Sequence, residues 1–139
     1  MGGSYNSRPR TILKGKSNYP TWVPSCKMEL RSEECLKALT EEEKRNPATL
    51  SADEITRQVT DWLSAREEVP DNGFSTQKIN ANRAKWRAEA KAEYDAYSNL
   101  NDKALGIIYN LCDKHVQTII ASETKAKGAW DRLADVYKQ

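Results

Sequence analysis

Apolar residues recur every three or four positions through most of this chain, which is the period of an amphipathic helix. The longest such series runs from Thr76 to Leu111 without a proline. It predicts one helix of more than thirty residues. Residues that favour helix ends cluster at 98–102, so we expect a bend near Asn101.

Shorter helical series flank the long one. Before it, we predict helices over Pro24–Leu39 and Ser51–Glu68, and the second opens on the pattern of a capping box. After it, Asp113 is expected to cap a short helix, and Ser122 or Thr124 a last one. No alternating apolar stretch of strand length occurs. The predicted fold is therefore all-α, a single compact bundle of about five helices.

A chain of 139 residues suits one domain, because two hydrophobic cores would be cramped at this length. Residues 1–17 carry Gly, Ser, Pro and scattered basic groups, which predicts a flexible basic arm whose Ile12 and Leu13 can dock onto the core. Residues 18–139 would form the helical domain. Within it, residues 40–75 are interpreted as an acidic, insertion-like segment with its own helix.

The formal net charge of +2 conceals an uneven distribution. Residues 1–37 carry a net charge of +4, residues 38–75 of −5 and residues 76–139 of +3. The basic side chains of the arm are candidate nucleic-acid contacts. They are Arg8, Arg10, Lys14 and Lys16. A solvated tail is the alternative interpretation, and the sparse spacing of the charges favours it.

Three widely spaced cysteines and one histidine limit the chemistry. This pattern predicts reduced thiols, no disulfide framework and no zinc site. Cys112 and His115 lie three residues apart, as a nucleophile and its base would on a helix, but nothing nearby supplies an oxyanion hole. We interpret them as a core thiol beside a surface imidazole, and expect no enzyme activity and no cofactor. Without a signal region or an apolar span, a cytoplasmic location is expected.

Three blocks of sequence share an order and spacing with one known family. The first block contains Gly15, Asn18, Tyr19, Trp22 and Leu30. The second contains Trp86, Ala104, Ile108 and Leu111, and the third Ala126, Trp130, Leu133 and Tyr137. Together they resemble the N-terminal capsid region of Gag proteins of copia-type LTR retrotransposons, or of a domesticated protein derived from one.

The resemblance implies a structural protein rather than an enzyme. Such a protein would associate with copies of itself into virus-like particles, and would contact RNA weakly through the arm. Neither a membrane nor a small-molecule substrate is implied. Residues 40–75 have no counterpart in the resemblance. The alternative is a helical nucleic-acid-binding or protein-interaction module that uses the basic arm.

Tryptophans on helical faces can pack in a core or stack on nucleic-acid bases. Trp22, Trp86 and Trp130 each lie on an apolar face, so we predict core packing for all three. Trp62 lies on the unmatched acidic helix, where it could cover the core or offer a partner surface. Basic residues and Tyr94 and Tyr97 alternate with acids along the long helix, which predicts a solvated face.

Overall fold

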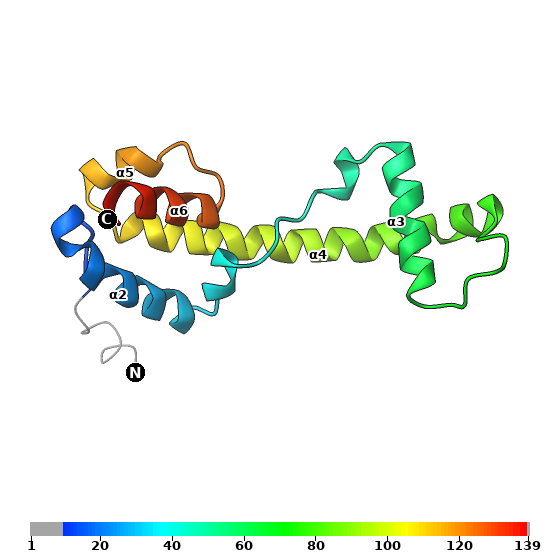
Figure 1. Cartoon of the computed structure of the whole chain (residues 1–139), viewed down its shortest axis with the longest axis horizontal. Coiled ribbons are helices and arrows are strands. Elements are labelled where there is room, and N and C mark those ends of the chain that lie inside the picture. The colour runs from blue at the N-terminus through cyan, green and yellow to red at the C-terminus, as the bar shows by residue number, and fades with distance from the viewer. Residues whose placement is uncertain (1–9, 139) are drawn as a thin grey trace. The chain divides into compact units, whose positions relative to one another are not determined.

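The computed structural model describes residues 10–138, and the prediction of an all-α fold with about five helices is confirmed within them (Figure 1). The helices are α2 (Tyr19–Ser32), α3 (Ala52–Ser64), α4 (Thr76–Asn110), α5 (Lys114–Ile120) and α6 (Ala126–Tyr137). Three short 3₁₀ turns accompany them, namely η1 (Lys16–Asn18), η2 (Leu36–Leu39) and η3 (Pro47–Thr49).

The helices form two compact units, each with its own core, where the length of the chain predicted one. Unit 1 comprises the described residues up to Glu42 and those from Ser98 onward, and unit 2 comprises Glu43–Tyr97. Helix α4 contributes residues to both. The physical reason is that the segment before α4 carries an apolar face of its own. That face packs on the first part of α4 and so makes a second core.

The core of unit 1 is assembled from segments far apart in the sequence. Its fully buried side chains come from the segment before η1, from α2, from the end of α4, and from α5 and α6. The largest of them are Leu13, Trp22, Leu30, Ile108, Ile120 and Leu133. Unit 1 therefore exists only when both ends of the chain meet.

Helix α2 begins at Tyr19, five residues before the predicted start at Pro24, and ends at Ser32. A proline inside a helix costs about 3 kcal/mol, because it removes a backbone hydrogen bond. Here Trp22, Cys26 and Leu30 are buried on one face of the helix, whereas Pro24 lies on the exposed face. The free energy gained by burying that face outweighs the cost of keeping Pro24 inside the helix. The rest of the predicted helix is the separate turn η2.

Residues 10–17, predicted as part of a flexible arm, pack against the helices of unit 1. Leu13 is fully buried, and its backbone pairs with the segment after α4: Leu13 N donates to Leu111 O at 2.8 Å and Asp113 N to Leu13 O at 3.0 Å. The side chain of Asn18 closes this segment, accepting from Lys14 N and donating to Ile12 O. Docking of the apolar pair was expected. The remainder of the predicted arm, with Arg8, lies outside the described residues.

Asn101 does not end α4, which runs on to Asn110, although such residues favour helix ends. Its side chain is buried and serves the neighbouring segment instead. The Asn101 amide oxygen accepts from Ala126 N at 2.7 Å, and its nitrogen donates to Thr124 O at 2.9 Å. A residue distant in sequence therefore caps α6, where Ser122 or Thr124 was predicted to do so. Asp113 caps α5 as predicted, accepting from Val116 N at 3.0 Å.

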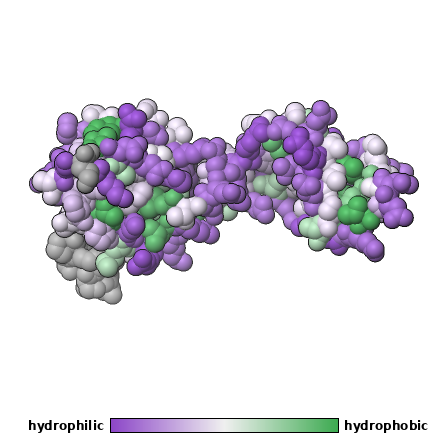
Figure 2. Space-filling model, viewed as in Figure 1, coloured by the Kyte–Doolittle hydropathy of each residue, from purple (hydrophilic) through white to green (hydrophobic). Residues whose placement is uncertain are grey.

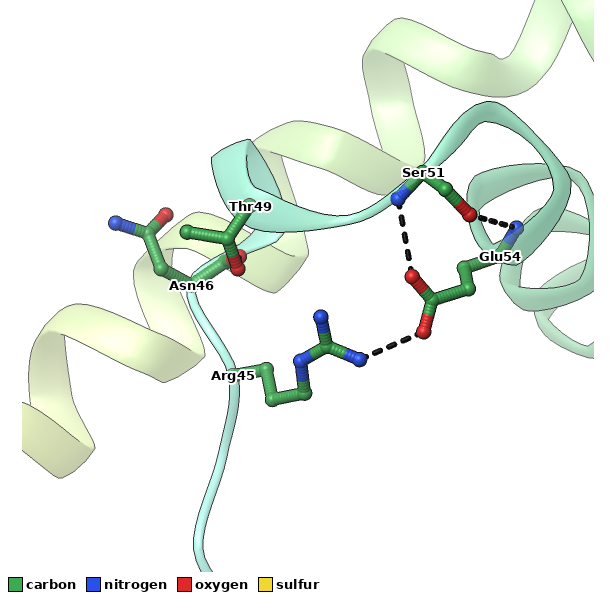
Figure 3. Close-up of polar contacts among 5 residues, drawn as sticks. All are labelled: Arg45, Asn46, Thr49, Ser51 and Glu54. Atoms are coloured by element: carbon green, nitrogen blue, oxygen red, sulfur yellow. Dashed lines mark hydrogen bonds and ion pairs between the residues drawn. The ribbon is translucent and has the colours of Figure 1, made fainter.

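In unit 2, helix α3 begins with the predicted capping box (Figure 3). Ser51 Oγ accepts from Glu54 N at 3.2 Å, and Glu54 Oε1 accepts from Ser51 N at 3.0 Å. The second carboxylate oxygen pairs with Arg45 at 2.6 Å. The hydrogen bond from Ser51 N, followed by the one from Arg45, holds the pKa of Glu54 below its usual value. The box is therefore fully formed at neutral pH, and α3 starts at Ala52.

The core of unit 2 joins Ile55, Val59 and Leu63 of α3 to Trp86 of α4. Ion pairs surround it. Arg66 meets Glu89 at 3.0 Å and Lys78 meets Glu67 at 2.8 Å. Acidic and basic stretches of the sequence thus neutralise one another inside this unit. Glu89 of α4 thus pairs with Arg66, a residue that follows α3.

Helix α2 ends in a tight turn that places a non-glycine residue in the left-handed region. Glu34 has φ 60°, and Cys35 N donates across the turn to Leu30 O at 2.9 Å. This is the geometry of a Schellman cap, in which glycine is the usual residue. The backbone of Glu34 is therefore strained by its own Cβ.

We predict that Glu34→Gly raises the free energy of unfolding by about 0.5–1 kcal/mol, because glycine adopts this conformation without steric cost. Urea denaturation of both proteins measures the change. Glu34→Ala is the control, since it removes the same side chain but keeps the Cβ, and it should give no gain. A loss of stability in Glu34→Gly would contradict the assignment.

The two cores predict two regions of separate stability. Leu63→Ala removes a buried side chain of unit 2 and should cost about 2–5 kcal/mol there. Hydrogen exchange read by mass spectrometry should show faster exchange in α3 and the start of α4, with α2 and α6 unchanged. Leu133→Ala should give the reverse pattern. Equal loss of protection in both regions would show that the units unfold together.

Candidate functional site

The residues that carry the family resemblance converge in unit 1, with one exception. Twelve of the thirteen lie in η1, α2, the end of α4 and α6 or directly beside them. Trp86 is the exception. It is buried, with 5% of its surface exposed, but in the core of unit 2. Trp86 packs in a core, as predicted, but this is a different core from that of Trp22 and Trp130, because α4 is long enough to serve two cores.

The carbonyl of Leu111 joins two of the three blocks. It accepts hydrogen bonds from Leu13 N at 2.8 Å and from the indole nitrogen of Trp22 at 2.9 Å. Carbonyl groups at a helix end have no donor within the helix. Leu13 N and the Trp22 indole therefore supply the donors that the carbonyl of Leu111 lacks at the C-terminus of α4. The third block then packs on the same tryptophan, since the Trp22 and Trp130 rings stack with centroids 5.4 Å apart.

A row of aromatic rings extends from this contact toward the surface. The Tyr19 ring lies 6.1 Å from Trp22 on one side and 6.1 Å from Tyr137 on the other. Burial raises the pKa of both tyrosines, so both phenols are neutral at physiological pH. Tyr19 and Tyr137 keep only a small exposed fraction, while Trp130 is half-buried.

A groove of about 570 Å³ opens over this row, between the start of α2 and helix α6. Its apolar lining consists of Tyr19, Pro20, Val23, Trp130, Ala134 and Tyr137. Its charged lining consists of Lys16, Lys27, Lys138 and Asp131. On the face drawn in Figure 2, hydrophilic residues cover most of the surface and hydrophobic residues form small separate patches.

The electrostatic character of the groove is basic. All three lysines are exposed, and Lys27 Nζ lies 5.9 Å from the centroid of the Trp130 ring. The single acid, Asp131, is paired with Lys127 at 2.8 Å. An apolar floor with a positive rim suits a ligand that combines acidic and apolar groups.

Of the basic residues proposed from sequence that the structure describes, Arg10 and Lys16 lie at different surfaces. Arg10 lies 3.7 Å from the carboxylate of Glu29, which is largely buried. Lys14 is exposed. Lys16 lines the groove. Lys27 and Lys138 were not predicted from the sequence, although the spacing of Tyr19, Val23 and Lys27 places all three on one face of a helix.

Trp62 is half-buried on the core of unit 2. Its indole nitrogen donates to Glu89 at 3.3 Å, and the Arg66 guanidinium lies 4.1 Å from the ring centroid. Of the two interpretations that the sequence left open, this geometry favours the one in which Trp62 covers a core. That core belongs to unit 2.

The thiols are not poised for nucleophilic chemistry. All three cysteines are buried and free, and burial raises the pKa of Cys112 to about 12. The Cys112 thiol donates to Ile108 O at 3.2 Å. Burial also raises the pKa of Cys26 and of Cys35. A protonated, buried thiol is a poor nucleophile.

Residues 10–138 contain neither a metal site nor a membrane-spanning helix. No group of three or more His, Cys, Asp and Glu side chains in that range is placed to hold a metal ion. No helix there combines the length and the apolar character needed to cross a membrane.

Comparison of the chain with protein-family models, with curated proteins and with solved structures gives no match. The geometry of the residues therefore carries the functional argument.

The double hydrogen bond to Leu111 makes a prediction about Trp22. Trp22→Phe keeps an aromatic ring but removes the N–H donor and part of a fully buried side chain, and should cost about 1–3 kcal/mol of unfolding free energy. Trp130→Phe is the matched control, because its indole nitrogen makes no hydrogen bond among the described residues. Urea denaturation should show the larger loss for Trp22→Phe. Equal losses would show that the hydrogen bond contributes nothing.

Proposed function

We propose that this chain is a structural, Gag-like capsid module of a copia-type LTR retrotransposon, or of a domesticated protein derived from one. Its function is self-association toward a virus-like particle. One observation supports the proposal above the others: residues from all three blocks, though not Trp86, share a single core around Leu111 and Trp22. Their order and spacing along the sequence thus correspond to proximity in three dimensions.

The physical character of unit 1 suits this function. An assembly module needs a fixed shape and weak surfaces that recur in every copy, since many weak contacts add up to a stable shell. The backbone bridge from Leu13 and the aromatic stacking hold the shape of unit 1. Its groove is a surface that every copy carries. The buried thiols agree with a reducing, intracellular setting.

Unit 2 is proposed to be an addition to this module. It comprises most of the segment without a counterpart in the resemblance, together with the first part of α4. Unit 2 has its own core and its own ion pairs, and its residues do not contribute to the core of unit 1.

We predict that the average mass of the chain in solution rises with its concentration. Sedimentation across a series up to about 1 mM detects contacts as weak as about 4 kcal/mol. The association should weaken less steeply with salt than binding to a nucleic acid does, because apolar burial contributes to it and fewer charges are involved. A chain that stays monomeric over the whole series would contradict self-association.

The same series, repeated with single-stranded RNA, tests the alternative of a nucleic-acid-binding module. Binding through Arg10, Lys14 and Lys16 should weaken steeply as salt rises, because counterions are released from the nucleic acid. RNA binding by a monomeric chain would favour that alternative over the capsid proposal.

A further inference from the structure

We propose that the groove of unit 1 binds the loop Glu67–Asp71 of a second copy of this chain. The inference rests on the proposed self-association and names the two surfaces that would carry it. It identifies the groove as the acceptor site and an acidic loop as its ligand.

The groove needs a ligand with two properties. Its floor of Tyr19, Val23 and Trp130 suits an apolar group, because covering this apolar surface removes it from water and so favours binding. Its three exposed lysines need negative charge, since the one acid in the lining already has a lysine partner. Short acidic segments with one or two apolar side chains meet both needs.

The loop after α3 has both properties. Every residue from Ser64 to Gly73 is exposed. Within it, Val69 leaves 50% of its surface in solvent, which is unusual for a large apolar residue of this chain, and Pro70 follows it. Glu68 and Asp71 flank this apolar pair and make no ion pair among the described residues. Glu67 adds a third carboxylate, which Lys78 holds at 2.8 Å.

The match between the two surfaces is one of charge and of shape. Val69 and Pro70 are small enough for a groove of about 570 Å³, and proline rings pack well on aromatic faces. Glu68 and Asp71 bring two free carboxylates to Lys27, Lys138 and Lys16. The contact is heterologous, because the groove and the loop are different surfaces. Each added copy therefore presents a further groove or loop, as a growing assembly requires.

Two charge-reversed variants of the full chain test the contact. The groove variant carries Lys27→Glu and Lys138→Glu, and the loop variant carries Glu68→Lys and Asp71→Lys. All four positions are exposed, so both variants should melt like the parent chain. Each alone should weaken association in sedimentation by about tenfold or more, because like charges would face one another.

Mixing the two variants is the decisive measurement. The groove variant keeps a normal loop and the loop variant keeps a normal groove, so a 1:1 mixture should regain association. The matched control is Lys14→Glu with Lys37→Glu, which makes the same charge change in unit 1 at exposed residues that do not line the groove. It should associate like the parent chain. Variants that associate normally, or a mixture that regains nothing, would overturn the inference.

A synthetic peptide of residues 64–74 separates this inference from the proposed function. Added to the full chain, it should shift the NMR signals of Tyr19, Lys27 and Trp130, and a scrambled peptide of equal composition should not. A chain that associates but ignores the peptide and both reversals leaves the proposed function standing and overturns the inference. A chain that stays monomeric overturns the proposed function and also the second copy as the ligand of the groove, even where the groove binds the peptide. Equal binding of the scrambled peptide would show that the groove takes acidic segments at large, and would overturn the second copy as its ligand.

Discussion

The arrangement of unit 1 depends on how one carbonyl group, that of Leu111, is satisfied at the end of α4. Its two donors, Leu13 N and the Trp22 indole, come from a segment about 90 residues earlier in the chain. Both donors are buried, so leaving the carbonyl unpaired would cost about 1–3 kcal/mol. The contact fixes the start of α2 against the end of α4. The aromatic row and the groove above it follow from that placement.

Tertiary contacts of this kind override several local preferences. Pro24 is kept inside α2 because the opposite face of the helix carries Trp22, Cys26 and Leu30 into the core. Asn101 stays within a continuous helix because its amide finds two partners in the segment that leads into α6. The cost of a proline inside a helix is about 3 kcal/mol, and that of an asparagine is below about 1 kcal/mol. In each case the free energy gained by burial, or by pairing buried polar groups, is larger.

The charges of the folded units differ from those of the corresponding stretches of sequence. Along the sequence, residues 38–75 carry a net charge of −5. In the fold, unit 2 also includes the first part of α4, so its 55 residues hold ten acidic and nine basic side chains. Cross-pairs such as Arg66 with Glu89 use this balance. The charges used by the proposed contact are local: three lysines beside the aromatic groove, and two carboxylates beside Val69.

The helical class, the extent of α4, the caps at Ser51 and Asp113, and the apolar positions of each helix could be predicted from sequence alone. These features depend on neighbours within about four residues, and such neighbours are visible as spacing. Only the tertiary structure decided that there are two cores, that Trp86 lies apart from Trp22 and Trp130, and that Asn101 caps α6. The groove belongs to this second group, because Lys16, Lys27 and Lys138 meet only after the two ends of the chain pack together. Such contacts depend on which apolar faces find each other, and the periodicity of one helix carries no record of its partner.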